Sequence, residues 1–437
     1  MWCLGDRNKE IGIDESTRIL PKETKSFKKQ DSPFIVFCYG VTPPFLNRRR
    51  IPFGMLKSGI KKLACGAEHF MLLTQDNNVL VAGNNEYGQC ARNPQLPIKN
   101  LEKLQEGVAE ETPQNLKLNS FSIDNHEVLD VACGSHHGLL LVEHKTTGKK
   151  SVLAVGHELP CGFLDKTHRS VPTQVLLPEE HSSEVPKAVF AGHMRSCILM
   201  ESGKVLIWGE WFNGMRQRRP KEVHFNLEGD SVKKVAIGKM FALFVTVKGK
   251  LFSIGDNTYG ELGLGFKKRY SSIPVLVSTV EKEVLDCAAG ARHCVVLDKF
   301  GKVYSFGDNS EGQCGVESAR CYLPEEIPTK GVFGEENVQI RFIYAGDAHS
   351  AIVTSDGDLF MWGDNSAGRL GMEGNCVLRP TIAEEVLGRN ICEVGLGGLF
   401  SMVLVGMSQY SLIDRNTNLI KSFSLISGMV SKEIQGN

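Results

Sequence analysis

Short apolar runs rich in Val, Leu, Ile, Phe and Tyr recur along the chain and are bounded by Gly, Asn, Asp and Ser. Runs such as residues 303–306 (VYSF) and 351–354 (AIVT) are too short for helices, and they contain residues that favour strands. Linkers such as residues 355–358 (SDGD) have the chemistry of tight hairpin turns. The pattern therefore predicts a chain of β-hairpins.

These runs belong to a phrase that occurs seven times: a small residue, x, Gly, x, x and an aromatic residue or His, followed at once by an apolar strand. Successive marker glycines are 46 to 68 residues apart. A second phrase, a strand ending in Gly and followed by a polar turn, trails the first six markers. Such spacing indicates a repeat architecture. The markers are Gly66, Gly134, Gly192, Gly238, Gly290, Gly346 and Gly397.

Two more strand candidates precede most markers, for example residues 273–277 and 284–288 before Gly290. Four strands per unit are the content of one propeller blade. One such sheet cannot bury both faces alone, so the blades must pack on one another and close into a ring. We predict an all-β, seven-bladed β-propeller of four-stranded antiparallel blades over residues 36–406, between an N-terminal segment (1–35) and a C-terminal tail (407–437).

The seventh copy lacks its second phrase, which predicts a ring closed by pairing of N- and C-terminal strands. Two N-terminal runs could supply the closing strand. We favour residues 2–6 (WCLGD), which are similar to Trp362-Gly-Asp. Residues 34–40 (FIVFCYG) are the alternative and would otherwise be an extra strand near the first blade.

Taken together, the two phrases resemble the repeat of the regulator of chromosome condensation family. The match is best at residues 237–265, 289–315 and 345–371, and it is degraded in the second, third and last copies. The resemblance implies a seven-bladed propeller. It also implies one of two functions: a protein-interaction scaffold, which we favour, or a guanine nucleotide exchange factor for a Ran-like or related small GTPase.

The third residue after the marker is His69, His137, His293 or His349 in four copies, and Arg195, Phe241 or Phe400 in the others. A lone histidine could be a metal ligand or an acid–base group. Four at one repeat position, each in a different blade, favour a repeated structural contact. We therefore expect no catalytic, metal or cofactor site.

The balance of basic and acidic residues indicates which class of partner to expect. The 437 residues include 50 basic and 50 acidic side chains, so we expect other proteins as partners and no direct binding of nucleic acid. No apolar segment is long enough to span a membrane. Thirteen cysteines without a C-x-x-C pair favour packed thiols in a reducing compartment, cytoplasmic or nuclear, with cytoskeletal association left open.

Since the repeat is architecture, function must lie in the loops that do not repeat: residues 92–125, 157–186 and 210–219. Short basic clusters and one aromatic pair are the candidate contacts for a partner, although each could also be an ordinary solvated or packed loop. The candidates are Arg48, Arg49, Arg50, Trp211, Phe212, Arg216, Arg218, Arg219, Lys267, Lys268 and Arg269.

Overall fold

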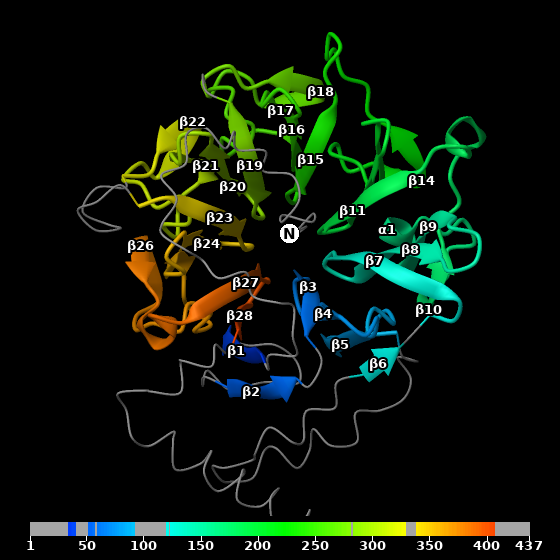
Figure 1. Cartoon of the computed structure of the whole chain (residues 1–437). Helices are drawn as coiled ribbons and strands as arrows, with labels where there is room; N and C mark the ends of the chain where they lie inside the picture. Colours follow the sequence, from blue (N-terminus) through cyan, green and yellow to red (C-terminus); the bar gives the residue numbers. More distant parts are fainter. Residues whose placement is uncertain are drawn as a thin grey trace, which may run out of the picture.

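The computed structural model describes residues 34–40, 51–56, 59–91, 119–121, 123–280, 283–328 and 338–406. Within these ranges, seven sheets of four antiparallel strands surround a central axis (Figure 1). This confirms the predicted seven-bladed β-propeller. In the first six blades the chain runs outward from the innermost strand to the outermost one.

The blades are numbered here in chain order. Blade one contains β3 (Ile60–Cys65), β4 (His69–Thr74), β5 (Val79–Gly83) and β6 (Asn119–Phe121). Blade two contains β7 (His126–Cys133), β8 (His137–His144), β9 (Lys150–Gly156) and β10 (Arg169–Gln174). Blade three contains β11 (Pro186–Gly192), β12 (Arg195–Met200), β13 (Val205–Glu210) and β14 (Arg216–Glu222). Blade four contains β15 (Val232–Ile237), β16 (Phe241–Thr246), β17 (Leu251–Asp256) and β18 (Tyr270–Leu276).

Blade five contains β19 (Val284–Ala289), β20 (His293–Asp298), β21 (Val303–Asp308) and β22 (Arg320–Glu326). Blade six contains β23 (Ile340–Ala345), β24 (His349–Thr354), β25 (Leu359–Asp364) and β26 (Cys376–Ile382). Blade seven contains β27 (Asn390–Leu396), β28 (Phe400–Gly406), β1 (Phe34–Gly40) and β2 (Ile51–Leu56). In the part of the chain that the structure describes, three short helical segments lie in connections: α1 (Glu158–Cys161), η4 (Glu179–His181) and η5 (Glu384–Val386).

Burial explains why these runs carry apolar residues without strict alternation. Every residue of β16 (FALFVT) and of β20 (HCVVLD) is buried, because a second strand has a neighbouring blade on each of its faces. The outermost strands have an exposed side; in β22 only Cys321 is buried. The core is therefore a series of apolar layers between adjacent blades, such as the layer around Phe241 and Phe306.

Ring closure corrects one prediction. Strand β1 pairs with β28 over its whole length, from Phe34 opposite Gly406 to Gly40 opposite Phe400, and β2 completes the sheet. The closing strand is therefore the alternative run, residues 34–40, and not residues 2–6, which lie outside the described residues. The predicted boundary at residue 36 also cuts through β1. A third strand is buried on both faces, and FIVFCYG has the continuous apolar sequence that such a position requires.

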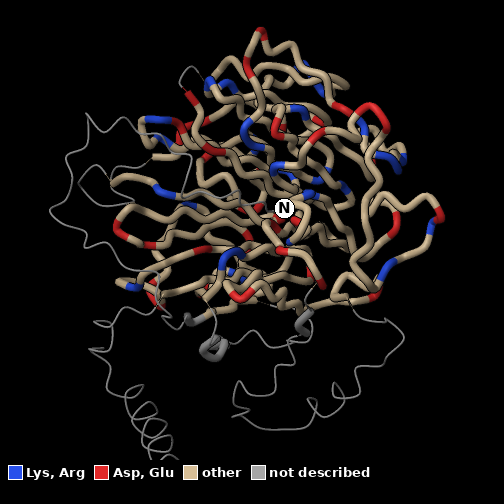
Figure 2. Tube along the Cα trace, turned by 45° about the vertical axis from the view of Figure 1, so that its right-hand side comes forward, with Lys and Arg blue, Asp and Glu red and all other residues tan. Residues whose placement is uncertain are grey.

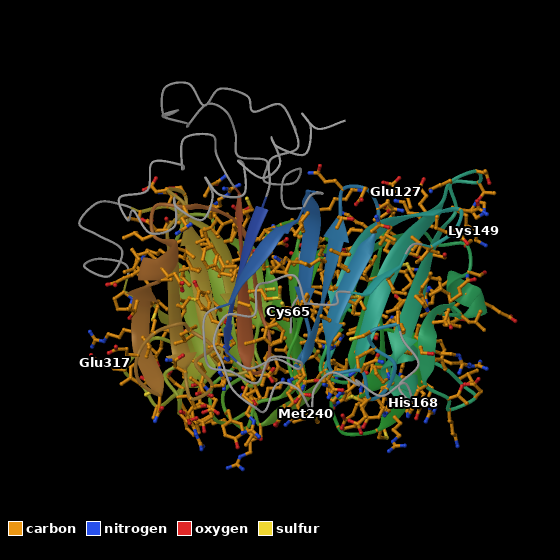
Figure 3. All side chains as sticks on the ribbon, turned by 90° about the horizontal axis from the view of Figure 1, so that it is seen from below. Cys65, Glu127, Lys149, His168, Met240 and Glu317 are labelled. Atoms are coloured by element: carbon orange, nitrogen blue, oxygen red, sulfur yellow. The ribbon has the colours of Figure 1, made fainter. Side chains whose placement is uncertain are left out.

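The two rims of the propeller carry different loops. One rim, called here the loop face, is made by the loops from the innermost to the second strand, which hold the marker glycines, and by the loops from the third to the outermost strand. Figure 3 shows Met240, His168 and Glu317 on this rim and Glu127 and Lys149 on the opposite one. Basic and acidic residues are interleaved along the trace (Figure 2).

Candidate functional site

The repeated histidines join neighbouring blades through a serine. Nε2 of His137 lies 2.9 Å from Ser196 Oγ, Nε2 of His293 lies 2.8 Å from Ser350 Oγ, and Nε2 of His349 lies 2.9 Å from Ser401 Oγ. In each pair the serine follows the marker glycine of the next blade by four residues. The predicted structural contact is thus a hydrogen bond across a blade junction.

The proton on these rings can be assigned from the serine. Ser350 Oγ donates its only hydrogen to the carbonyl of Gln313 at 2.8 Å, so His293 must donate from Nε2 to Ser350. Both side chains are fully buried. Burial lowers the pKa of His293 to about 3, which keeps the ring neutral and unsuited to acid–base chemistry near neutral pH.

The remaining copies lack the serine partner in the next blade. Where the next blade has no serine, the ring differs: Phe241 faces the Cys294 position, and Phe400 packs against Phe70 with ring centroids 6.4 Å apart. His69 keeps the imidazole although the next blade has Gly138 at the serine position. A serine in the following blade thus accompanies three of the four histidines, and this pairing does not account for His69.

This pairing gives a testable difference between two histidines. We expect His293→Phe to lower the free energy of unfolding by about 1–2 kcal/mol, because Ser350 loses a buried hydrogen bond. His69→Phe, which removes no bond to a serine side chain of the next blade, is the matched control and should cost clearly less. Urea unfolding followed by tryptophan fluorescence measures both. Equal losses would contradict a role for the His–Ser pair.

Arg195 replaces the histidine in blade three and links blades in another way. Loops on five junctions are joined by backbone hydrogen bonds, for example Ser135 N to His193 O at 2.7 Å and Gly398 N to Ala67 O at 2.9 Å. At the junction of blades three and four, Arg195 donates instead to the carbonyl of Lys239. The divergent third copy thus keeps the junction closed with a side chain.

Of the two aromatic residues predicted to contact a partner, one is buried and the other is partly exposed. Phe212 is 1% exposed and lies under the guanidinium of Arg195, whose Cζ is 4.9 Å from the ring centroid. It packs inside the propeller and is not an accessible contact, which corrects its place among the candidates. Trp211 is partly exposed, with Lys221 Nζ 5.5 Å from its ring centroid.

The residues of the predicted basic clusters also differ in exposure and pairing. Lys267, Lys268 and Arg269 are exposed in the loop that leads into β18, on the loop face, and Arg216 is exposed where β14 begins on the same face. Arg219 is exposed farther along β14. Arg218 is paired with Glu158 across the junction of blades two and three, so its role is structural. Arg48, Arg49 and Arg50 lie outside the described residues, as do residues 92–118 of the long insertion.

Sequence reasoning missed two tyrosines that occupy one repeat position on the loop face. Tyr259 follows β17 and is flanked by two arginines of blade five: Cζ of Arg292 lies 4.5 Å, and Cζ of Arg320 lies 5.0 Å, from its ring centroid. The signal that could have found it is the phrase Asn-x-Tyr-Gly, which the first and fourth copies share.

Tyr87 is the other tyrosine of this position, in the first copy. Its ring lies among three histidines of blade two, with centroids 5.0 Å from His136, 4.8 Å from His157 and 5.0 Å from His168. The same position on the loop face therefore holds a tyrosine among guanidinium groups in one place and among imidazoles in another.

The described ranges contain no three His, Cys, Asp or Glu side chains placed to hold a metal ion, and no helix within them has the length and hydropathy to cross a bilayer. Every described cysteine is a free thiol, and all but Cys376 and Cys392 are buried. The buried set includes the repeated positions Cys65, Cys133, Cys90 and Cys314, which confirms that these residues pack in the core.

A profile of the RCC1-like domain matches residues 2–403 of the chain. The E3 ubiquitin-protein ligase HERC2 of Mus musculus is 34% identical over 208 residues, which cover 44% of this chain and 4% of the ligase. A secretion-regulating guanine nucleotide exchange factor of Bos taurus is 29% identical over 204 residues, 44% of either chain. This chain thus spans less than half the length of both relatives.

Among solved structures, Prp20p of Saccharomyces cerevisiae, described together with its binding properties to Gsp1p and histones, superposes with a TM-score of 0.67. It shares 20% sequence identity with this chain and covers 87% of it, and 93% of the Prp20p chain is matched. At this identity the similarity shows the fold alone.

Proposed function

Because this chain belongs to the RCC1-like domain family, we propose that it is a protein-binding platform, a component or adaptor of a larger assembly, whose partner docks on the loop face. The observation that carries this proposal is the contrast between the two sets of polar residues. The repeated ones are buried in junction bonds such as His293–Ser350, whereas the partly exposed Trp211 and the exposed run Lys267, Lys268 and Arg269 lie outside the repeated phrases, on the loop face.

The family relatives support an interaction role, since they include a ubiquitin ligase and an exchange factor that share this domain. The propeller is held rigid by its junction bonds, so binding would cost little ordering of the loop-face backbone. We expect the protein to work in the cytoplasm or nucleus, where reducing conditions keep its buried thiols free.

Affinity capture from a cell extract with matched variants tests the proposal. The loop-face variant carries Arg216→Gln, Lys267→Gln, Lys268→Gln and Arg269→Gln. The control removes the same number of charges from the opposite rim, at Lys145, Lys149, Lys248 and Lys250, all exposed. We expect partners that the wild type and the control retain and the loop-face variant loses. Equal capture by both variants would refute docking on this face.

Nucleotide exchange on a small GTPase is the second candidate. It is favoured by the similarity to the bovine exchange factor and by the fold shared with Prp20p, which binds Gsp1p. Release of fluorescent GDP from a panel of purified small GTPases would decide it. Acceleration by the wild type that the loop-face variant loses would support exchange, and no acceleration of any GTPase would exclude it for that panel.

A further inference from the structure

The junction of blades four and five carries a cluster on the loop face that neither the repeat nor the ring closure requires. It consists of Tyr259, Phe266, Arg292, Arg320 and Tyr322, and it is called here the Tyr259 platform. The two guanidiniums lie over the ring of Tyr259, and Phe266 and Tyr322 meet edge to face with centroids 6.4 Å apart. The loop carrying Tyr259 and Phe266 is fixed to the next blade by Gly265 N donating to Tyr322 O at 2.9 Å.

The apolar part of the platform is open to solvent. Phe266 is 67% exposed and the adjacent Leu323 is 47% exposed. Large apolar side chains at neighbouring positions of a rigid rim favour a site where a partner side chain can be buried. Because Phe266 precedes the exposed run Lys267, Lys268 and Arg269, apolar and basic contacts lie within one loop.

The two arginines of the platform are available to an acidic ligand. No ion pair joins Arg292 or Arg320 to a carboxylate of the described residues, whereas Arg218, Lys234 and Arg369 each have one. Two carboxylates at the same junction already accept hydrogen bonds: Asp256 from Thr258 at 2.7 Å and Asp308 from the Ser310 backbone at 3.2 Å. The five basic side chains Arg292, Arg320, Lys267, Lys268 and Arg269 thus outnumber the three acidic ones at this junction, Asp256, Asp308 and the buried Glu261.

This arrangement suits a carboxylate ligand. A guanidinium has five N–H donors, and its edge matches the two oxygens of a carboxylate, so both arginines can bind one although Arg320 also has a hydrogen bond to Tyr322. Resting on the proposed function, we propose that the Tyr259 platform docks an acidic segment of a partner protein that also presents an apolar side chain to Phe266.

The distribution of charge favours a protein over nucleic acid as the occupant. Binding along a phosphate backbone requires a continuous basic surface. Here basic and acidic residues are equal in number and interleaved along the trace (Figure 2), so the platform is a local cationic spot. An exposed phenylalanine with a free apolar neighbour also fits a peptide side chain.

The first and second blades provide an internal reference. His136 lies two residues after its marker glycine, as Arg292 does, and His168 directly precedes β10 much as Arg320 begins β22. His157 and His168 accept backbone N–H groups at Nδ1, both at 3.2 Å. Burial, followed by the neighbouring His168, lowers the pKa of His157 to about 4. Of the two tyrosines, only Tyr259 is flanked by arginines.

Fluorescence anisotropy with a labelled peptide of glutamates interrupted by phenylalanines tests the platform. We expect Arg292→Gln with Arg320→Gln to weaken binding about tenfold or more. Lys248→Gln with Lys250→Gln, on the opposite rim of blade four, should change it less than about twofold. Phe266→Ser should weaken the phenylalanine-containing peptide but not a peptide of glutamate and serine. All five side chains are exposed, so the variants should fold, and thermal unfolding will verify this.

Absence of peptide binding by the wild type, equal weakening by the two charge variants, or tighter binding of oligothymidylate than of the peptide would each overturn this inference. If these results occur while partner capture still depends on the loop face, only the Tyr259 platform is refuted. If capture proves independent of the loop face, the proposed function itself fails.

Discussion

Gly307→Ala is expected to lower the free energy of unfolding by more than about 3 kcal/mol. Gly307 has φ +111°, and a Cβ placed there would lie 2.4 Å from the carbonyl oxygen of Arg292 and 2.7 Å from Cα of His293. Both are backbone atoms of the paired strand β20 and its loop, which cannot move without opening the sheet. Denaturant unfolding of purified protein measures the loss, and soluble yield gives a second readout.

Gly214→Ala is the matched control for this prediction. Gly214 also has a positive φ, +82°, but nothing lies within 4 Å of the added Cβ. It should therefore cost only the left-handed strain of alanine, about 1 kcal/mol. If the two variants lost equal stability, the close backbone approach at Gly307 would have no energetic role.

The prediction extends to every copy of the second phrase. The glycines at the last or second-to-last position of the third strands of blades one to six have φ between +106° and +119°, and in each a Cβ would meet the loop between the first two strands. The set is Gly83, Gly156, Gly209, Gly255, Gly307 and Gly363. In all six, the close approach of backbone atoms explains why the position holds glycine.

Glu261→Gln is expected to raise the free energy of unfolding by about 2–3 kcal/mol near pH 8 and to change it little near pH 5. Glu261 is 2% exposed, and burial raises its pKa from 4.5 to about 7, with a smaller contribution from Asp256. The folded chain thus holds this proton more tightly than the unfolded chain does. The stability that this group contributes is complete below about pH 4.5 and is lost as the pH rises through about 7.

The same position in the next blade provides a control for this prediction. Gln313 occupies the same position in blade five, and its Oε1 accepts from the Glu311 backbone at 2.8 Å, as Glu261 Oε2 accepts from the Tyr259 backbone at 2.7 Å. Gln313→Glu should therefore destabilise the protein near pH 8 and not near pH 5. Urea unfolding of both variants at the two pH values tests this. A Glu261→Gln effect independent of pH would show that the carboxylate is not the cause.

The seven-fold count and the strand positions could be predicted because each copy repeats the same local requirements. Glycine is needed where φ is positive, and apolar residues are needed where a strand is covered on both faces. The structural role of the repeated histidine was predicted correctly for the same reason. Its serine partner belongs to another copy, so the bond itself became visible only when blades were placed side by side.

The candidate contacts were predicted less well. Short basic and aromatic runs do not reveal which residues lie next to them. Arg218 has an ion pair with Glu158, and Phe212 is covered by Arg195, although both fall within residues 210–219, which the sequence predicts to be a loop. The Tyr259 platform contains residues from three separate segments of two blades: two loops and strand β22. No local sequence signal brings Arg292 and Arg320 to the same ring.

By itself, the sequence determined the all-β propeller, its seven blades and the structural nature of the repeated glycines and histidines, since these depend on the period of the chain and on local backbone conformation. Only the tertiary structure decided which N-terminal run closes the ring, which charged residues are already paired, and where tyrosine and arginines form one surface. Those outcomes depend on contacts between residues tens or hundreds of positions apart, such as Phe34 with Gly406, and packing across blade junctions selects among alternatives that the sequence leaves equivalent.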